Sequence, residues 1–94
     1  MQVQTVADIT PNSTPTPINS NSSLEITAYW IAITASGSTI RWGDANVGSG
    51  RGNAIPTGTT VIIPRISFDQ QGYDLSTVYV YGTGSDKVSI SYGA

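Results

Sequence analysis

Glycine-rich segments are the first places where this sequence could do chemistry, because glycine loops can cradle phosphate groups. Residues 48–52 (GSGRG) contain three glycines, and residues 82–87 (GTGSDK) end in a lysine. A dinucleotide-binding turn requires G-x-G-x-x-G between a strand and a helix, and a P-loop requires its own spacing before a helix. Asn53 stands where the last glycine of the first motif should be, and no helical pattern follows either segment. We therefore interpret both segments as turns.

Acidic residues provide the second candidate chemistry, which is a cation site. Asp44 and Asn46 are spaced like alternate oxygen ligands of a calcium loop, but Gly48 stands at the third position and no glutamate closes the loop. Asp69 or Asp74 could complete such a site only if the fold brought them close. The simpler interpretation is an aspartate-containing turn.

The residue types that usually carry catalysis are missing from this chain. It contains no histidine and no cysteine, which removes the commonest general base, the usual nucleophilic triads and Cys/His zinc sites. Of the six acidic residues, only Glu25 falls in an expected strand, so paired catalytic carboxylates are not favoured. A domain of 94 residues also rarely encloses a ligand pocket of ~300 Å³ or more. We predict a protein that is not an enzyme and uses no metal or cofactor.

The charge balance narrows the choice of partners. The chain has four basic residues (Lys and Arg) and six acidic residues (Asp and Glu). Charged residues make up 11% of the chain, against ~25% in ordinary domains. This leaves no basic face for nucleic acid. The longest apolar run, residues 28–33, is far shorter than the ~20 residues of a membrane helix. Residues 1–10 lack the basic start and apolar stretch of a signal peptide. We expect synthesis in a host cytoplasm without a signal peptide.

Two tyrosines give the most specific indication of binding. Tyr79 and Tyr81 alternate with Val78 and Val80, so on a strand they lie on the face opposite the valines. Tyrosine combines a large contact area with one polar atom, which suits a protein interface, and its ring could also stack on a sugar. The alternative is that this face is a second inner face of a sandwich, or that it covers a loop.

The elements that must position these residues are β-strands. The chain holds eighteen Ile and Val residues against two Leu, and β-branched side chains favour strands. No stretch keeps a helical period for three turns without meeting Gly or Pro. Short runs between turn residues predict a small antiparallel β-sandwich or barrel of about six to eight short strands. The predicted strands are residues 24–34 (bending near Ala28 and Tyr29), 39–42, 59–63, 77–81 and 87–92, with a short one at 53–55.

Two hairpins are expected from the short connections between these strands. The first joins residues 77–81 to 87–92 through a five-residue glycine-containing loop. Its predicted inward side chains are Val78, Val80, Val88 and Ile90. The second joins residues 30–34 to 39–42, with Ile40 and Trp42 inward and Arg41 outward. Residues 43–56 and 65–75 are expected to form long loops.

The chain is predicted to divide near residue 23, into an extended N-terminal arm (1–23) and a β-sandwich domain (24–94). Residues 10–23 (TPNSTPTPINSNSS) contain three prolines, which exclude helix and remove hydrogen-bond donors. One short strand is expected at residues 2–7, and an ordinary disordered tail is the alternative. The apolar residues that could anchor the arm to a partner are Val3, Val6, Ile9 and Ile18.

Several segments resemble small structural proteins of tailed bacteriophages. They are residues 30–34 (WIAIT), 37–43 (GSTIRWG), 55–64 (IPTGTTVIIP) and 74–92 (DLSTVYVYGTGSDKVSISY). A similar pattern of a strand, a Pro-Thr-Gly turn and a closing "Val-Tyr-Val … Val-Ser-Ile" hairpin occurs in head decoration, or cement, proteins. The resemblance covers about residues 28–92 and consists of turn glycines and alternating strands. It implies a β-sandwich that oligomerises and lies on a capsid.

The sequence therefore predicts a capsid decoration protein, located on the outer surface of a virion, that stabilises junctions between capsid subunits. Its expected partners are the major capsid protein and copies of itself, as a dimer or trimer. A carbohydrate-binding or adhesive module of a fibre or tail, using Trp30, Trp42 and the tyrosines, is the alternative, and a tail or connector component is a third. The residues expected to bind partners are Val3, Val6, Ile9, Ile18, Arg41, Arg51, Tyr79 and Tyr81.

Overall fold

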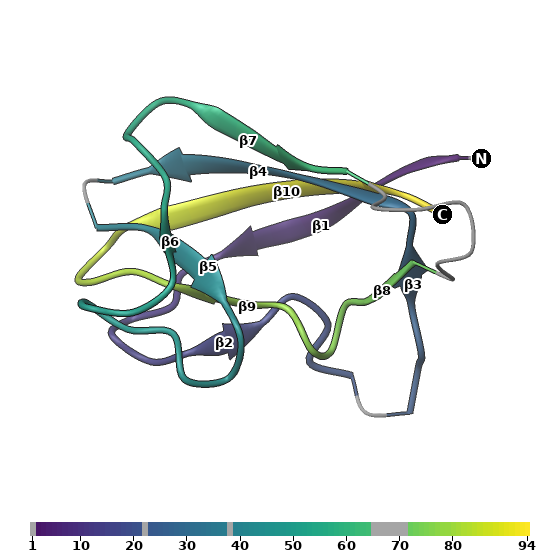
Figure 1. Ribbon diagram of the computed structural model, residues 1–94, viewed down its shortest axis with the longest axis horizontal. Helices are drawn as coiled ribbons and strands as arrows, with labels where there is room; N and C mark the ends of the chain where they lie inside the picture. The colour runs from purple at the N-terminus through teal and green to yellow at the C-terminus, as the bar shows by residue number, and fades with distance from the viewer. Residues whose placement is uncertain (1, 22, 38, 65–71) are drawn as a thin grey trace.

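The protein is a sandwich of two antiparallel β-sheets. The computed structural model describes residues 2–21, 23–37, 39–64 and 72–94, and every named element within them is a strand. Sheet A contains, in spatial order, β1 (Val3–Ile9), β10 (Lys87–Gly93), β4 (Trp30–Ser36) and β7 (Thr60–Ile63). Sheet B contains β2 (Thr16–Pro17), β9 (Tyr79–Tyr81), β5 (Arg41–Gly43) and β6 (Asn53–Ala54). Figure 1 shows the two sheets as separate layers, with β7 and β1 at the edges of sheet A.

A third, smaller pair of strands extends one end of the sandwich. It consists of β3 (Thr27–Ala28) and β8 (Tyr73–Asp74), which pair antiparallel. The chain leaves β3, passes through Tyr29 and enters β4, so the bend expected near Ala28 and Tyr29 is confirmed. The antiparallel all-β sandwich predicted from the sequence is likewise confirmed. Most of the loop predicted at residues 65–75 lies outside the described residues, and β8 falls in its last part.

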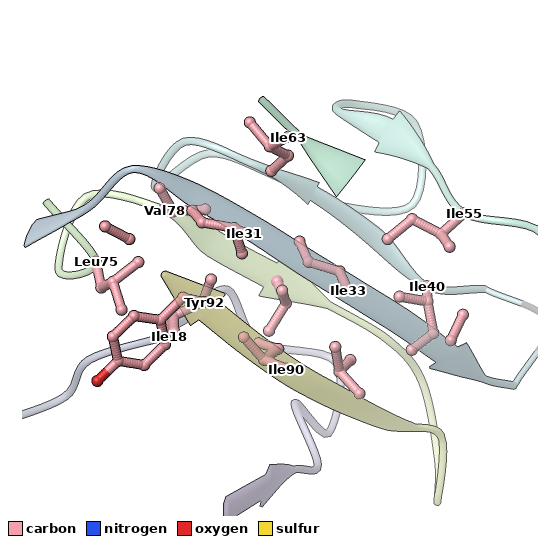
Figure 2. Close-up of a cluster of buried hydrophobic side chains, with 14 residues drawn as sticks. Ile18, Ile31, Ile33, Ile40, Ile55, Ile63, Leu75, Val78, Ile90 and Tyr92 are labelled. Carbon is pink, nitrogen blue, oxygen red and sulfur yellow. The ribbon is translucent and has the colours of Figure 1, made fainter. Parts of the chain in front are cut away.

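The core lies between the two sheets and is built from the inward side chains of their strands and from apolar residues of the adjoining connections. Ile31 and Ile33 of β4 stand at its centre, both without measurable exposure (Figure 2). The outward residues Trp30, Ala32 and Thr34 are only half-buried, so burial alternates along β4, as in a strand with one face toward the core. The buried cluster comprises Ile18, Ala28, Ile31, Ile33, Ala35, Ile40, Ile55, Ile63, Leu75, Val78, Val80, Val88, Ile90 and Tyr92.

Both predicted hairpins are wrong, although the predicted inward faces are correct. β9 pairs with β2 and β5 in sheet B, whereas β10 pairs with β1 and β4 in sheet A. The strand pair β4 and β5 is divided between the sheets in the same way. Each connection therefore crosses the sandwich, and Val80 of β9 and Val88 of β10 belong to the same core cluster from opposite sheets. Alternating valines are buried in either arrangement, so alternation could not reveal this difference.

The two crossing connections are tied to each other by side-chain hydrogen bonds. The Thr39 hydroxyl donates to the Asp86 carboxylate at 2.6 Å, and the Thr39 and Thr83 hydroxyl oxygens lie 2.8 Å apart. The backbone N–H of Thr83 donates back to Thr39 Oγ1 at 3.1 Å. These bonds therefore join the two connections beside the pair Arg41 and Tyr81, where β5 begins and β9 ends.

The residues predicted to form an arm are part of the sandwich, which corrects the division near residue 23. β1 pairs with β10 along most of its length, from Val3 opposite Gly93 to Ile9 opposite Val88. β2 pairs with β9 in the other sheet, and Ile18 is 4% exposed in the core. Prolines exclude helix, but an edge strand such as β2 tolerates Pro17 because one side of its backbone needs no partner.

The proline-rich segment between β1 and β2 folds as a defined turn. Asn12 and Ser13 both have positive φ, at 54° and 61°, and the N–H of Thr14 donates to the Pro11 carbonyl at 3.2 Å. This is the geometry of a type I′ turn, which Asn favours. The N–H of Ser13 also donates to the Gly82 carbonyl at 2.7 Å, which joins the turn to the connection between β9 and β10.

Candidate partner-binding surface

The outer face of sheet B gathers three of the residues predicted to bind partners. Arg41 of β5 lies directly opposite Tyr81 of β9, and Tyr79 lies two pairs further along, opposite Gly43. Val80 between the two tyrosines is fully buried, so the tyrosines point away from the core. Arg41 and both tyrosines are half-buried. We call this surface the Tyr/Arg face, and it consists of Pro17, Arg41, Ala54, Tyr79 and Tyr81.

Flanking strands complete the Tyr/Arg face on both sides. Pro17 of β2 is the register partner of Tyr79, and Ala54 of β6 is the partner of Arg41. Both are compact side chains that leave the larger aromatic and guanidinium groups accessible. The Arg41 guanidinium donates to the Gly52 carbonyl at 3.1 Å, which holds it against the sheet. A positioned arginine loses less rotamer entropy on binding than a mobile one.

The loop between β5 and β6 has a fixed shape because a buried valine anchors it. Val47 is 2% exposed, and a Cβ on Gly52 would lie 2.5 Å from Val47 Cγ2 and 2.9 Å from the Trp42 carbonyl oxygen. Gly52 also has a φ of +108°, which side chains rarely adopt. Glycine at this position therefore allows the loop to fold back over β5.

Arg51 lies at the tip of this anchored loop. Gly48 and Arg51 exchange two backbone hydrogen bonds, of 3.0 and 3.2 Å, and the Arg51 side chain is exposed. Since Gly52 follows Arg51 and accepts the hydrogen bond from Arg41, the two arginines belong to one region of the surface. Four of the eight predicted partner-binding residues thus lie on or beside the Tyr/Arg face.

A hollow of about 280 Å³ opens beside Arg41. Its walls come from both connections and from the anchored loop, and they include Thr39, Ser49, Pro56 and Thr83. The Thr39 and Thr83 pair described above forms one rim, so the same hydrogen bonds that fix the connections also shape the hollow. It gives the Tyr/Arg face a recess into which a partner side chain can insert.

The four apolar residues predicted as anchors do not form one surface. Val3 is 71% exposed and lies on β1, at the edge of sheet A. Val6 and Ile9 pack partly against the core, and Ile18 is inside it. Ile18 cannot contact a partner without unfolding the sandwich, so its assignment as an anchor is wrong. The reason is that the local sequence, an apolar residue among prolines and serines, is compatible both with a free arm and with a strand at a sheet edge.

The acidic residues considered for calcium have turn-forming roles in the part of the chain that the structure describes. Asp44 Oδ1 accepts the N–H of Asn46 at 2.9 Å, as in an aspartate turn. Asp74 Oδ1 accepts from both the hydroxyl and the N–H of Ser76. No three Asp or Glu residues among those described lie close enough to hold a metal ion. Asp69 lies outside the described residues.

The two tryptophans do not share a surface with the tyrosines. Trp42 packs against the core from the inner side of sheet B, opposite Val80. Trp30 lies in sheet A, where a Cβ on its register partner Gly93 would collide with the indole ring. The indole therefore covers Gly93 on sheet A, away from the Tyr/Arg face. The aromatic residues named for carbohydrate binding do not form a single platform.

Comparison with known proteins adds no relative to this description. No family model matches the chain, and neither the curated proteins nor the solved structures contain a match. The resemblance to phage decoration proteins therefore depends on the sequence segments alone. In the described ranges, no helix is long and apolar enough to span a bilayer.

Proposed function

We propose that this protein is a structural component of a virus particle, a decoration protein that binds the outer surface of the capsid and stabilises junctions between subunits. The observation that carries the proposal is the Tyr/Arg face, where Arg41, Tyr79 and Tyr81 project from paired strands of a rigid sheet. Tyrosine and arginine are enriched at the centres of protein interfaces and account for much of their binding energy. The resemblance of residues 28–92 to decoration proteins supports the same role.

The folded position of residues 3–18 changes how such binding is achieved. A free arm must be ordered on the capsid at a cost of about 1–2 kcal/mol per residue. The Tyr/Arg face is already ordered by strand pairing and by the hydrogen bond of Arg41 to Gly52, so association costs little conformational entropy. With extents of 36 × 28 × 22 Å, the sandwich offers faces compatible with the ~800 Å² per partner of a standard interface.

Purified particles from the source of this sequence provide the test. The protein should be present in them at a fixed ratio to the major capsid protein, and stripped particles should bind it again in a sedimentation assay. The double substitution Arg41→Ala and Tyr81→Ala should reduce occupancy at least about tenfold, since two interface centre residues cost more than about 1.4 kcal/mol together. Thr34→Ala and Thr60→Ala, on the outer face of sheet A, serve as the matched control and should leave occupancy unchanged.

Two outcomes would remove the proposal. One is the absence of the protein from purified particles. The other is equal occupancy for the Tyr/Arg variant and its control. A saturable change in tryptophan fluorescence on titration with a polysaccharide, lost in the Tyr/Arg variant, would instead favour the carbohydrate-binding alternative.

A further inference from the structure

We propose that β1 is the contact through which two copies of this chain pair, edge to edge, into one continuous sheet. The proposal concerns the free edge of sheet A. Among the strands within the described residues, β1 forms this edge, because it is the terminal strand of the sheet order and pairs there with β10. Unpaired backbone groups at a sheet edge readily pair with another strand unless the protein protects them.

The hydrogen bonds of the terminal residues reveal which groups of β1 face outward. Gln2 and Ala94 exchange two backbone bonds, of 2.9 and 3.0 Å. In an antiparallel ladder such pairs alternate, so Gln4 and Val6 also direct their N–H and C=O groups toward β10. Val3 and Thr5 therefore present both backbone groups to the open edge.

The other edges of sheets A and B are protected, among the strands that the structure describes. At the opposite edge of sheet A, the N–H of Ala35 donates to the Thr59 carbonyl, so alternation directs Thr60, Ile62 and Pro64 outward. Pro64 has no N–H to offer, and β7 has only four residues. In sheet B, β2 and β6 have two residues each, and β2 contains Pro17. These features are the ones that proteins use to prevent edge pairing.

The exposed part of β1 carries no such protection. Residues 2–7 (QVQTVA) contain no charge and no proline. A bulge interrupts the pairing with β10 between Val6 and Ile9, so the straight part of the strand is its first half. Val3 also carries a large apolar side chain at 71% exposure, which a neighbouring strand would cover.

A second copy of this chain fits the β1 edge better than an arbitrary strand does, because the segment is self-complementary. With the two-fold axis at Gln4, Val3 lies opposite Thr5 of the other copy, and both such pairs exchange two hydrogen bonds. The two bulges then lie beyond the ends of the new ladder. No like charges meet, since the paired residues are neutral. An antiparallel pair of identical strands closes after two copies.

The dimer has a consequence that rests on the proposed function. The two-fold axis of such a pair is perpendicular to the sheet, so both copies present the Tyr/Arg face on the same side. A flat particle surface would then be bound bivalently, and the second contact would form at high effective concentration. The dimer itself requires no particle, so its test is independent of the sedimentation assay described above.

Single cysteines provide the sharpest test, because the natural chain has none. In the proposed register the two Gln4 residues form a non-hydrogen-bonded pair, with Cα atoms about 4.5 Å apart, which is within disulfide range. Gln4→Cys should therefore form a disulfide-linked dimer at least about tenfold faster than either of two control variants. In Val3→Cys the two cysteines are not opposite each other in the ladder, and in Thr60→Cys they lie on the opposite edge of sheet A. Equal rates for the three variants would overturn the proposal.

Light scattering on the cysteine-free protein provides the second measurement. The average mass should rise with concentration from 9.8 kDa toward twice that value. Thr5→Pro removes an outward N–H that the sandwich does not use, so the circular-dichroism spectrum should be retained while the dimer is lost. Ala54→Pro makes the same change at the edge of sheet B and should leave the dimer intact. There the N–H of Ile55 donates to the carbonyl of Ile40, just before β5, so alternation directs the N–H of Ala54 outward. A protein that stays monomeric up to millimolar concentration, or a dimer indifferent to Thr5→Pro, would refute the inference.

Discussion

Ile18→Ala tests whether the proline-rich segment belongs to the core. Ile18 is 4% exposed and its N–H donates to the Val78 carbonyl at 2.9 Å, so truncation empties a packed site without removing a backbone bond. Three buried carbon groups at about 0.8 kcal/mol each amount to about 2.4 kcal/mol. The unfilled cavity raises the expected loss in the free energy of unfolding to about 3 kcal/mol, inside the range for buried isoleucine.

Urea unfolding followed by tryptophan fluorescence measures this loss directly, because Trp30 and Trp42 report from different sheets. For a domain of this size, 3 kcal/mol corresponds to a decrease in Tm of about 12–24 °C. Ile62→Ala is the matched control: the same atoms are removed from a strand residue that is 63% exposed, so about 1 kcal/mol or less should be lost. If Ile18→Ala costs no more than Ile62→Ala, Ile18 is not a core residue and the proline-rich segment does not belong to the sandwich.

Two further predictions concern the anchored loop and an acidic turn. Gly52→Ala should reduce the free energy of unfolding by about 1–3 kcal/mol, because its φ is positive and the new Cβ would meet Val47. Gly50→Ala is the control: a Cβ at this position would meet no atom within 4 Å, so the same urea titration should show a loss of less than about 1 kcal/mol. The side-chain and backbone hydrogen bonds of Ser76 hold the pKa of Asp74 below its ordinary value of 3.8, against an opposing effect of desolvation. Ser76→Ala should therefore raise the pKa of Asp74 in a carboxyl NMR titration; an unchanged value would contradict that cause. Since the folded pKa is the lower one, the stabilisation is present at neutral pH and is lost as pH falls through the folded pKa.

Sequence alone predicted the strands and their inward faces well, because both depend on local properties. β-branched residues at every second position indicate strands whatever they pair with, and Val80, Val88 and Ile90 are buried as their alternation requires. Arg41 was correctly placed on the outer side of its strand, since its neighbours Ile40 and Trp42 are apolar. The pair Tyr79 and Tyr81 was correctly placed opposite the valines for the same reason.

The tertiary structure alone decided which strands pair and where the chain's first residues lie. A short loop between alternating strands is compatible with a hairpin and with a crossing between sheets, and only the packing of the whole core selects between them. The same holds for Ile18, whose polar and proline neighbours concealed a core position. The Tyr/Arg face exists because β5 and β9, thirty-five or more residues apart in sequence, are adjacent in sheet B. Alternation specifies the side toward which a residue points, whereas long-range pairing specifies its neighbours, and a binding surface is made of neighbours.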